Sequence, residues 1–262
     1  MKKKTILIAI LMAAIILLGF VRVSIPSKPV GILSAFDAEL QLLLDAAQID
    51  RTEKVGGVVF HIGKLEGKDV VMAEAGVGKV LSAATAATLI NKYNVGILTF
   101  TGIAGGVGDD VKVLDVVVAT DLIQHDFGVV SQDGFEWSPY AGVDRETGRI
   151  PVNEQLSVVA YEAAVSVVGK DNAFRGTIVT GDQFIASESY VERLHNDFGA
   201  LATEMEGAAV ARVSYAFGVP TVVIRCMSDK ADGNAHAVIE EFGVKAADIS
   251  ASIVIEMLKS LK

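Results

Sequence analysis

Residues 203–229 read TEMEGAAVARVSYAFGVPTVVIRCMSD, and this stretch decides the fold class of the chain. Glu204 to Phe217 carries small and apolar side chains at helical spacing, which predicts a helix. Thr221 to Met227 is a short apolar run of the kind that forms a buried strand, and the polar pair Ser228-Asp229 follows it. A helix that leads directly into a buried strand is typical of a protein in which helices cover a β-sheet.

Carboxylates lie at both ends of this stretch. Glu204 and Glu206 begin the predicted helix, and Asp229 ends the predicted strand. A charged group at the end of a buried element is costly unless it is solvated, paired or used in chemistry. If the fold brings these carboxylates to one edge of the sheet, they could hold a sugar and protonate a leaving group.

The same alternation continues on both sides of residues 203–229. Strands followed by helices predict an α/β sandwich with a largely parallel or mixed sheet, in which ligands bind beyond the carboxyl ends of the strands. The region 123–149 shows no clear period and is predicted to be irregular. We predict strands at residues 30–35, 58–65, 70–74, 95–101, 113–120 and 175–180, and helices at 37–48, 78–91, 152–168, 189–196 and 238–261.

Composition narrows the class of protein. The 262 residues are 51% hydrophobic, enough for one sizeable core and one domain. A formal net charge of −9 without basic clusters argues against nucleic-acid binding. The one cysteine, Cys226, lies in an apolar strand, where a buried thiol is favoured over a catalytic one. The 4 histidines are scattered and form no zinc pattern, so no metal site is predicted.

The N-terminus differs from the rest of the chain. Lys2 to Lys4 precede an uncharged run, Thr5 to Val21, and Arg22 ends it. This pattern is typical of a secretory signal or a signal anchor. We therefore divide the chain into a signal or anchor segment with its linker, residues 1–29, and a catalytic domain, residues 30–262.

Two outcomes remain open for residues 1–29. Gly19 to Ser24 makes a poor cleavage site, which favours an uncleaved anchor with the lysines in the cytoplasm and the domain outside. Cleavage would instead leave a secreted or periplasmic protein. In both cases the domain is exported, and this segment is its only predicted contact with the membrane.

Four more segments follow predicted strands, and each also has an ordinary explanation. The acids of Ser34 to Glu39 could simply complement a helix dipole. Glu74 to Lys79 lacks the Gly-Lys-Ser/Thr of a P-loop, so we interpret it as a tight turn that packs close to a ligand. Thr101 to Gly106 could be a plain turn. Gly181 to Ile185 could sandwich a flat base or pack in the core.

Together these segments resemble the 5′-methylthioadenosine/S-adenosylhomocysteine nucleosidase family, within the nucleoside phosphorylase superfamily. They occur in the order and spacing of that family across residues 30–262. Glu204-Met205-Glu206 with Ser228-Asp229 is the specific part of the match. The resemblance implies a three-layer α/β/α sandwich with a central mixed β-sheet, of the nucleoside phosphorylase type. It also implies hydrolysis of the N-glycosidic bond of adenine thionucleosides, no metal or organic cofactor, and a homodimer.

The resemblance also implies a role for each site residue. Asp229, helped by Ser228, would protonate adenine N7, which needs a carboxyl whose pKa burial has raised. Glu206 would bind the ribose hydroxyls and favour the oxocarbenium-like sugar. Glu39 would activate the attacking water, with Arg225 nearby. The remaining predicted substrate-binding residues are Met205, Phe184, Ile185, Val77, Ile103 and Glu204, the last with an indirect role.

The chain departs from the family pattern in two places. Ile103 stands where the family commonly has a serine that holds the water, so catalysis could be slower or another group could substitute. Residues 123–149 also match poorly. In the family a neighbouring subunit closes the 5′ pocket from this region, so His125, Phe127 and Phe135 are either interface residues or part of a solvated loop.

Three other functions are alternatives to hydrolysis of adenine thionucleosides. Phosphorolysis is disfavoured because Ser34 to Glu39 holds two acids and no base, and Thr101 to Gly106 holds no arginine. Futalosine hydrolysis stays possible. A second class is an exported protein that binds adenine nucleosides or takes part in surface interactions, with weak or no turnover. Only Ile103 supports this class.

Overall fold

The computed structural model of the protein describes residues 28–261. The predicted signal or anchor segment therefore lies almost wholly outside the described residues. Among the helices of residues 28–261, none is both long enough and apolar enough to cross a membrane.

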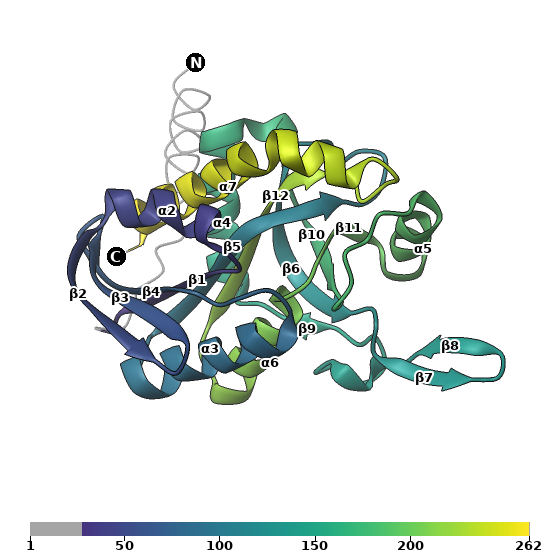
Figure 1. The fold of residues 1–262 in the computed structure, drawn as a ribbon, viewed down its shortest axis with the longest axis horizontal. Coiled ribbons are helices and arrows are strands. Elements are labelled where there is room, and N and C mark those ends of the chain that lie inside the picture. Colours follow the sequence, from purple (N-terminus) through teal and green to yellow (C-terminus); the bar gives the residue numbers. More distant parts are fainter. Residues whose placement is uncertain (1–27, 262) are drawn as a thin grey trace, which may run out of the picture.

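A large mixed sheet runs through the domain (Figure 1). Its strand order is β11-β10-β6-β12-β5-β1-β4-β3-β2, and the short strand β9 pairs with β6. The central neighbours β12, β5, β1 and β4 are parallel, so their carboxyl ends meet at the same edge. The strands are β1 (Val30–Ser34), β2 (Gln48–Val55), β3 (Val58–Leu65), β4 (Lys68–Glu74), β5 (Ile97–Gly106), β6 (Val116–Gln124), β9 (Ile150–Pro151), β10 (Ala173–Thr180), β11 (Ala200–Glu204) and β12 (Thr221–Asp229).

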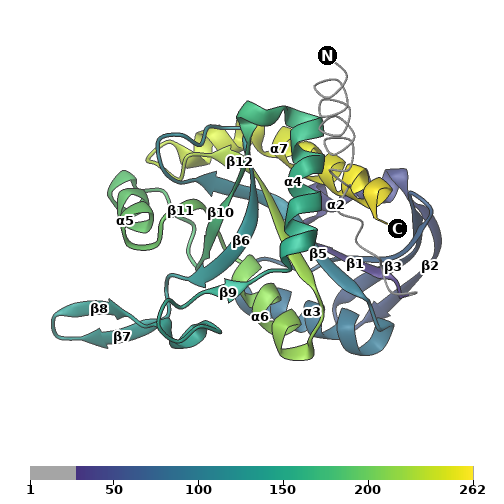
Figure 2. The same ribbon diagram turned by 180° about the vertical axis from the view of Figure 1, so that it is seen from behind.

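Helices cover both faces of this sheet (Figures 1 and 2). One face carries α2, α4 and α7, and the opposite face carries α3 and α6. Each helical layer buries its own set of aliphatic side chains against the sheet. The predicted three-layer α/β/α sandwich with a mixed sheet is therefore confirmed. The helices are α2 (Asp37–Ala46), α3 (Lys79–Tyr93), α4 (Glu154–Val168), α5 (Glu188–Phe198), α6 (Gly207–Phe217) and α7 (Ala235–Ser260), with short 3₁₀ turns at Pro139–Ala141 and Lys170–Asn172.

The sheet closes on itself at one end, a feature that we did not predict. Strand β11 pairs with β10 on one side and antiparallel with the end of β5 on the other, through Ala202 to Gly106 and Thr203 to Gly105. The plain turn considered as an alternative for residues 101–106 does not form, because β5 extends beyond the predicted end at Thr101 to Gly106 and all of it is buried. The predicted helix start at Glu204 was also wrong, because Glu204 ends strand β11 and helix α6 begins at Gly207.

Two other elements were missed because few of their side chains enter the core. Strand β2 is mostly exposed and rich in charged residues, so it has no clear apolar alternation. The region predicted to be irregular contains a hairpin of β7 (Gly128–Ser131) and β8 (Gly134–Trp137), which projects from the body of the domain (Figure 1). Seven of its eight strand residues are exposed.

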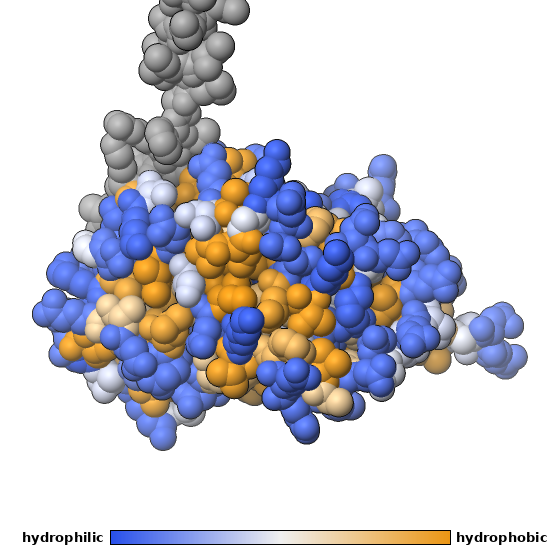
Figure 3. All heavy atoms as spheres, turned by 90° about the horizontal axis from the view of Figure 1, so that it is seen from above, coloured by the Kyte–Doolittle hydropathy of each residue, from blue (hydrophilic) through white to orange (hydrophobic). Residues whose placement is uncertain are grey.

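The surface over the layer of α2, α4 and α7 is mixed in polarity. Figure 3 looks down on this layer and shows hydrophobic residues gathered in the middle of the face, with hydrophilic residues around them. Val244 of α7 is one exposed aliphatic residue of this layer. All of the predicted site residues except Arg225, by contrast, line the cavity described next.

Candidate active site

A cavity of about 220 Å³ opens at the carboxyl ends of the central strands. Segments that are far apart in the sequence meet there, because β1, β5 and β12 are parallel neighbours and the closure by β11 adds the residues that follow it. Of the predicted site residues, all but Arg225 line the cavity: Glu39, Val77, Ile103, Phe184, Ile185, Glu204, Met205, Glu206, Ser228 and Asp229.

Glu39 lies in the first turn of α2, and backbone amides hold its carboxylate from two sides. Oε2 accepts hydrogen bonds from the N–H groups of Ala35 (2.6 Å) and Phe36 (3.3 Å). Oε1 accepts a hydrogen bond from the N–H of Ile103 on β5 (2.8 Å). Burial raises the pKa of Glu39, while Arg225 and these N–H groups act in the opposite direction. A raised pKa makes this carboxylate a better proton acceptor near neutral pH.

Gly102 allows Glu39 and Arg225 to approach the same point of β5. A Cβ atom at this position would collide with Nη1 of Arg225 and with the carboxylate of Glu39. Arg225 is fully buried, and its Nη1 and Nε have no hydrogen-bond partner within residues 28–261. The candidate base Glu39 therefore has the guanidinium of Arg225 next to it, and two nitrogen atoms of this guanidinium make no hydrogen bond within the described residues.

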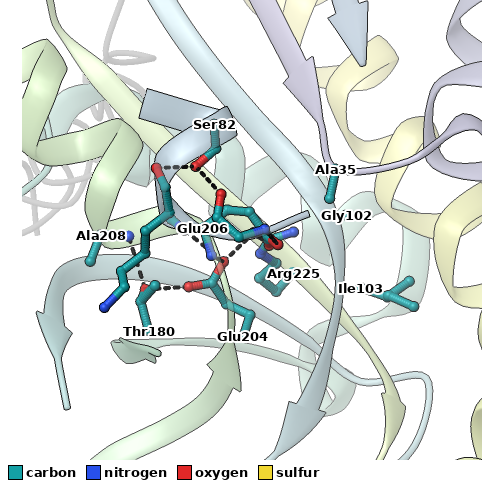
Figure 4. A network of polar contacts seen from close by, with 12 residues as sticks. Ala35, Ser82, Gly102, Ile103, Thr180, Glu204, Glu206, Ala208 and Arg225 are labelled. Atoms are coloured by element: carbon teal, nitrogen blue, oxygen red, sulfur yellow. Dashed lines mark hydrogen bonds and ion pairs between the residues drawn. The ribbon is translucent and has the colours of Figure 1, made fainter. Parts of the chain in front are cut away.

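The same arginine pairs with both glutamates of the Glu204-Met205-Glu206 segment (Figure 4). Its Nη2 donates to Oε2 of Glu204 and, at 3.3 Å, to Oε2 of Glu206. Glu204 also accepts hydrogen bonds from the Thr180 hydroxyl and from the N–H groups of Glu206 (3.1 Å) and Gly207 (2.7 Å). Glu204 therefore holds Arg225 and the backbone of Glu206 in place, and its indirect role in substrate binding stays a prediction.

Glu206 also lines the cavity and accepts fewer hydrogen bonds than Glu204 does. Burial, followed by the charge of Glu204, raises the pKa of Glu206 to about 7. The N–H of Gly78 donates to its Oε1 at 2.8 Å and connects it to the turn before α3. Gly78 has φ of 93°, which favours glycine. The turn predicted to pack against a ligand thus helps to hold the carboxylate predicted to bind ribose.

Asp229 lies at the end of β12, buried on the other side of the cavity. Its Oδ2 accepts a hydrogen bond from the Ser228 hydroxyl (2.7 Å), and its Oδ1 accepts one from the N–H of Ala231 (2.7 Å). Burial raises the pKa of Asp229 against the effect of these two hydrogen bonds. A carboxyl with a raised pKa can keep its proton nearer to neutral pH and deliver it to a bound base.

The rest of the cavity wall is largely apolar. Phe184 and Ile185 come from the loop after β10, and Val77 comes from the turn before α3. Val77 and Phe184 are partly exposed at the rim. The side chain of Ile103 lines the wall near Glu39, so it offers no hydroxyl there, but its N–H still binds the Glu39 carboxylate.

Sequence reasoning missed several residues of the site. Phe36 and Thr203 lie inside segments that we singled out, but we predicted site roles only for the neighbouring acidic residues and Met205. Ile239 of α7 and Thr180 of β10 have no signal of their own in the sequence. One interface candidate was wrong: His125 is completely buried in its own chain, whereas Phe127 and Phe135 are exposed.

The chain is similar in sequence to proteins of a known family. Residues 29–259 match the model of the phosphorylase superfamily. A 5′-methylthioadenosine/S-adenosylhomocysteine nucleosidase of Shewanella halifaxensis is 35% identical over 233 residues, which cover 88% of this chain and 99% of the relative. An aminodeoxyfutalosine nucleosidase of Helicobacter pylori is 36% identical over 237 residues, which cover 89% and 99%.

The fold is also similar to that of solved structures. The 5′-methylthioadenosine/S-adenosylhomocysteine nucleosidase of Neisseria meningitidis, in complex with methylthio-immucillin-A, superimposes with a TM-score of 0.81 at 34% identity. The superposition covers 89% of this chain and 100% of that structure.

Proposed function

This chain belongs to the 5′-methylthioadenosine/S-adenosylhomocysteine nucleosidases of the phosphorylase superfamily, and on that premise we propose that its cavity hydrolyses adenine thionucleosides. The reaction cleaves the N-glycosidic bond of S-adenosylhomocysteine or 5′-methylthioadenosine and releases adenine and the 5′-thioribose. The observation that carries the proposal is that Glu39, Glu206 and Asp229 line one cavity, although they lie on separate segments of the chain.

Asp229 acts on the leaving group. As the bond between C1′ and N9 breaks, its electron pair moves into the adenine ring, and Asp229 gives its proton to N7. Burial of the carboxyl keeps this proton available, and the hydrogen bonds from Ser228 and from the Ala231 N–H stabilise the carboxylate that forms. The ring then leaves as neutral adenine.

Glu39 acts on the nucleophile. A water molecule beside its carboxylate loses a proton to Glu39 while the water oxygen bonds to C1′. The unpaired Nη1 of Arg225 lies behind the same point of β5, where its positive charge acts on Glu39. Asp229 has then lost one proton and Glu39 has gained one, and exchange with solvent restores both groups.

The site favours water over phosphate as nucleophile. Glu39 lies at this side of the cavity, and its negative charge would repel a phosphate ion. The guanidinium behind that point belongs to Arg225, which already pairs with Glu204 and Glu206. The reaction is therefore hydrolysis.

The test is adenine release from S-adenosylhomocysteine, 5′-methylthioadenosine and aminodeoxyfutalosine, each with and without phosphate. We expect release that does not depend on phosphate, with free ribosyl product. Aminodeoxyfutalosine is included because of the relative that is 36% identical. Release that requires phosphate would contradict hydrolysis. No release from any of the three, with adenine nucleosides still bound, would favour the binding-protein alternative.

A pH profile tests the role of Glu206. We expect kcat/KM to fall as the pH drops below about 7, because protonation of Glu206 removes the charge that binds ribose and stabilises the cationic sugar. Glu206→Gln should lower kcat/KM roughly ten- to hundredfold, the loss of a charge-assisted hydrogen bond. In this variant the fall of kcat/KM at low pH should instead follow the pKa of Glu39.

The same variant should discriminate less against a 2′-deoxy substrate than wild type does, since the carboxylate no longer accepts from the ribose hydroxyls. Exposed Glu241 on α7 supplies the control, because Glu241→Gln should leave the profile unchanged. An acid limb that stays in place in Glu206→Gln would assign the limb to another group.

We further propose a homodimer. Exposed apolar side chains lie close to the cavity rim and on the projecting hairpin. Such side chains are unfavourable in water and are suited to contact with a second copy of the chain. Val80 and Leu81 of α3 follow the Val77 turn, and Phe127, Val129 and Val130 belong to the hairpin region. Sedimentation velocity would show the state of the protein, and a monomer at micromolar concentration would contradict the proposal.

Export of the domain also remains a proposal. It rests on Lys2 to Lys4 and the uncharged run from Thr5 to Val21. Residue 28 leads into the amino end of β1, whereas the cavity opens at the carboxyl ends of the strands. An anchor at the N-terminus would therefore leave the cavity accessible. Fractionation of cells that express the full chain would distinguish an anchored, a secreted and a cytoplasmic protein.

A further inference from the structure

Phe184 occupies an exposed position for a residue that is expected to stack on a base. It belongs to the loop between β10 and α5, lines the cavity and is 43% exposed. If an aromatic ring on an open loop must be ordered each time a ligand binds, the cost of ordering lowers the affinity of the site for that ligand. A stacking residue in this position therefore needs support from outside the cavity.

His236 supplies a contact of this kind. It lies in the first turn of α7, and its ring stacks on Phe184 with centroids 4.5 Å apart and an interplanar angle of 29°. His236 does not line the cavity itself. Because His236 covers one face of the Phe184 ring, a base can stack only on the other face.

A second contact ties the Phe184 loop to the segment between Asp229 and α7. The N–H of Ser187, at the end of the Phe184 loop, donates to the carbonyl of Ala231 (2.8 Å). The N–H of Ala231 donates in turn to Oδ1 of Asp229 (2.7 Å). The Phe184 loop is thus tied at one end to the segment that follows Asp229 and, through His236, to the start of α7.

We propose that His236 is a positioning residue that holds Phe184 in the orientation for stacking on adenine. The role of the stack rests on the proposed function, in which adenine is the base. His236 contacts Phe184 and does not line the cavity, so its effect on the base is exerted through Phe184. Its charge also lowers the pKa of Asp229, and both His236→Ala and His236→Phe remove that effect. Because Phe184 stacks on the base before and during bond cleavage, the support acts on binding of substrate and transition state alike.

The experiment compares His236→Ala with His236→Phe, which restores an aromatic partner. His236→Ala should raise KM for 5′-methylthioadenosine and Kd for adenine by roughly three- to tenfold, the size of an aromatic pair interaction, with kcat unchanged. His236→Phe should return both constants to within about twofold of wild type, because the pair can form again. Glu241→Ala is the control: an exposed residue of α7 with no side-chain hydrogen bond within residues 28–261.

Two results would overturn the proposal. Unchanged KM and adenine Kd in His236→Ala would show that Phe184 needs no support from His236. A fall in kcat that His236→Phe does not correct would show a chemical or purely structural role for the imidazole. The adenine Kd is measured without turnover, so it tests His236 even if the wild type hydrolyses no substrate. Failure of hydrolysis and failure of the stack are therefore separate outcomes, and a wild type that does not bind adenine contradicts both.

Discussion

Asp229→Asn should lower kcat for 5′-methylthioadenosine by roughly 10²- to 10⁴-fold, the usual contribution of a general acid. The amide has the shape of the carboxyl and can still accept the hydrogen bond from the N–H of Ala231. It cannot give a proton to N7 with comparable ease. The bond to adenine would then have to break with negative charge left on the ring, and this raises the barrier.

A substrate with a better leaving group makes this test specific. A 5′-methylthioriboside of 4-nitrophenol needs little protonation to depart, so Asp229→Asn should slow its hydrolysis far less than that of the adenine nucleoside. Asp248→Asn is the matched control, because Asp248 is exposed on α7 and does not line the cavity. Equal losses on both substrates, or near-normal turnover of 5′-methylthioadenosine, would remove Asp229 from the role of acid.

The raised pKa of Asp229 also predicts the direction of the basic limb. The acid is active in its protonated form, so kcat/KM should decline as the pH rises through the pKa of this group. Burial moves that pKa upward and thus extends activity toward neutral pH. This limb should be absent for the nitrophenyl substrate, which provides a check on the same assignment.

Glu39→Gln is expected to cause the second large loss, roughly 10²- to 10⁴-fold in kcat, because the amide cannot accept a proton from water. Adenine binding should change by only a few-fold, since Glu39 acts on the water and not on the base in the proposed function. Such a split between turnover and affinity distinguishes an enzyme from a protein that only binds nucleosides.

Stability must be measured beside this rate. The Glu39 carboxylate accepts from the N–H groups of Ala35, Phe36 and Ile103, and an amide NH₂ would face at least one of them. A lower melting temperature is therefore expected for Glu39→Gln, whereas Asp37→Asn, in the same helical turn but exposed, should alter neither stability nor rate by much. Full activity of a folded Glu39→Gln protein would exclude Glu39 as the base.

Local sequence patterns were enough to predict the fold class and the candidate carboxylates of the cavity. The layered α/β fold could be predicted because helical and extended periods are local properties of the chain. The carboxylates Glu39, Glu206 and Asp229 could be selected because each follows or precedes a buried element, where an unused charge is costly. The polar strand β2 and the hairpin of β7 and β8 could not be predicted, since they bury too few side chains to leave a period.

Contacts between segments that are far apart in the sequence could not be predicted from local patterns. Nothing in residues 200–204 or 97–106 indicates that β11 pairs with the end of β5, because the pairing depends on how the whole sheet closes. That closure places the Glu204 segment beside Arg225 and raises the pKa of Glu206 through burial and the charge of Glu204. The stack of His236 on Phe184 joins the first turn of α7 to a loop about fifty residues earlier in the chain.

The sequence by itself thus determined the fold class and identified the candidate carboxylates Glu39, Glu206 and Asp229, because both depend on the type of side chain and its place along a strand or helix. The tertiary structure alone decided which carboxylates share a cavity, which one carries a pKa near 7, and what supports the base-stacking ring. Those properties depend on burial and on distances between segments, and a linear order of residues specifies neither until the sheet has closed.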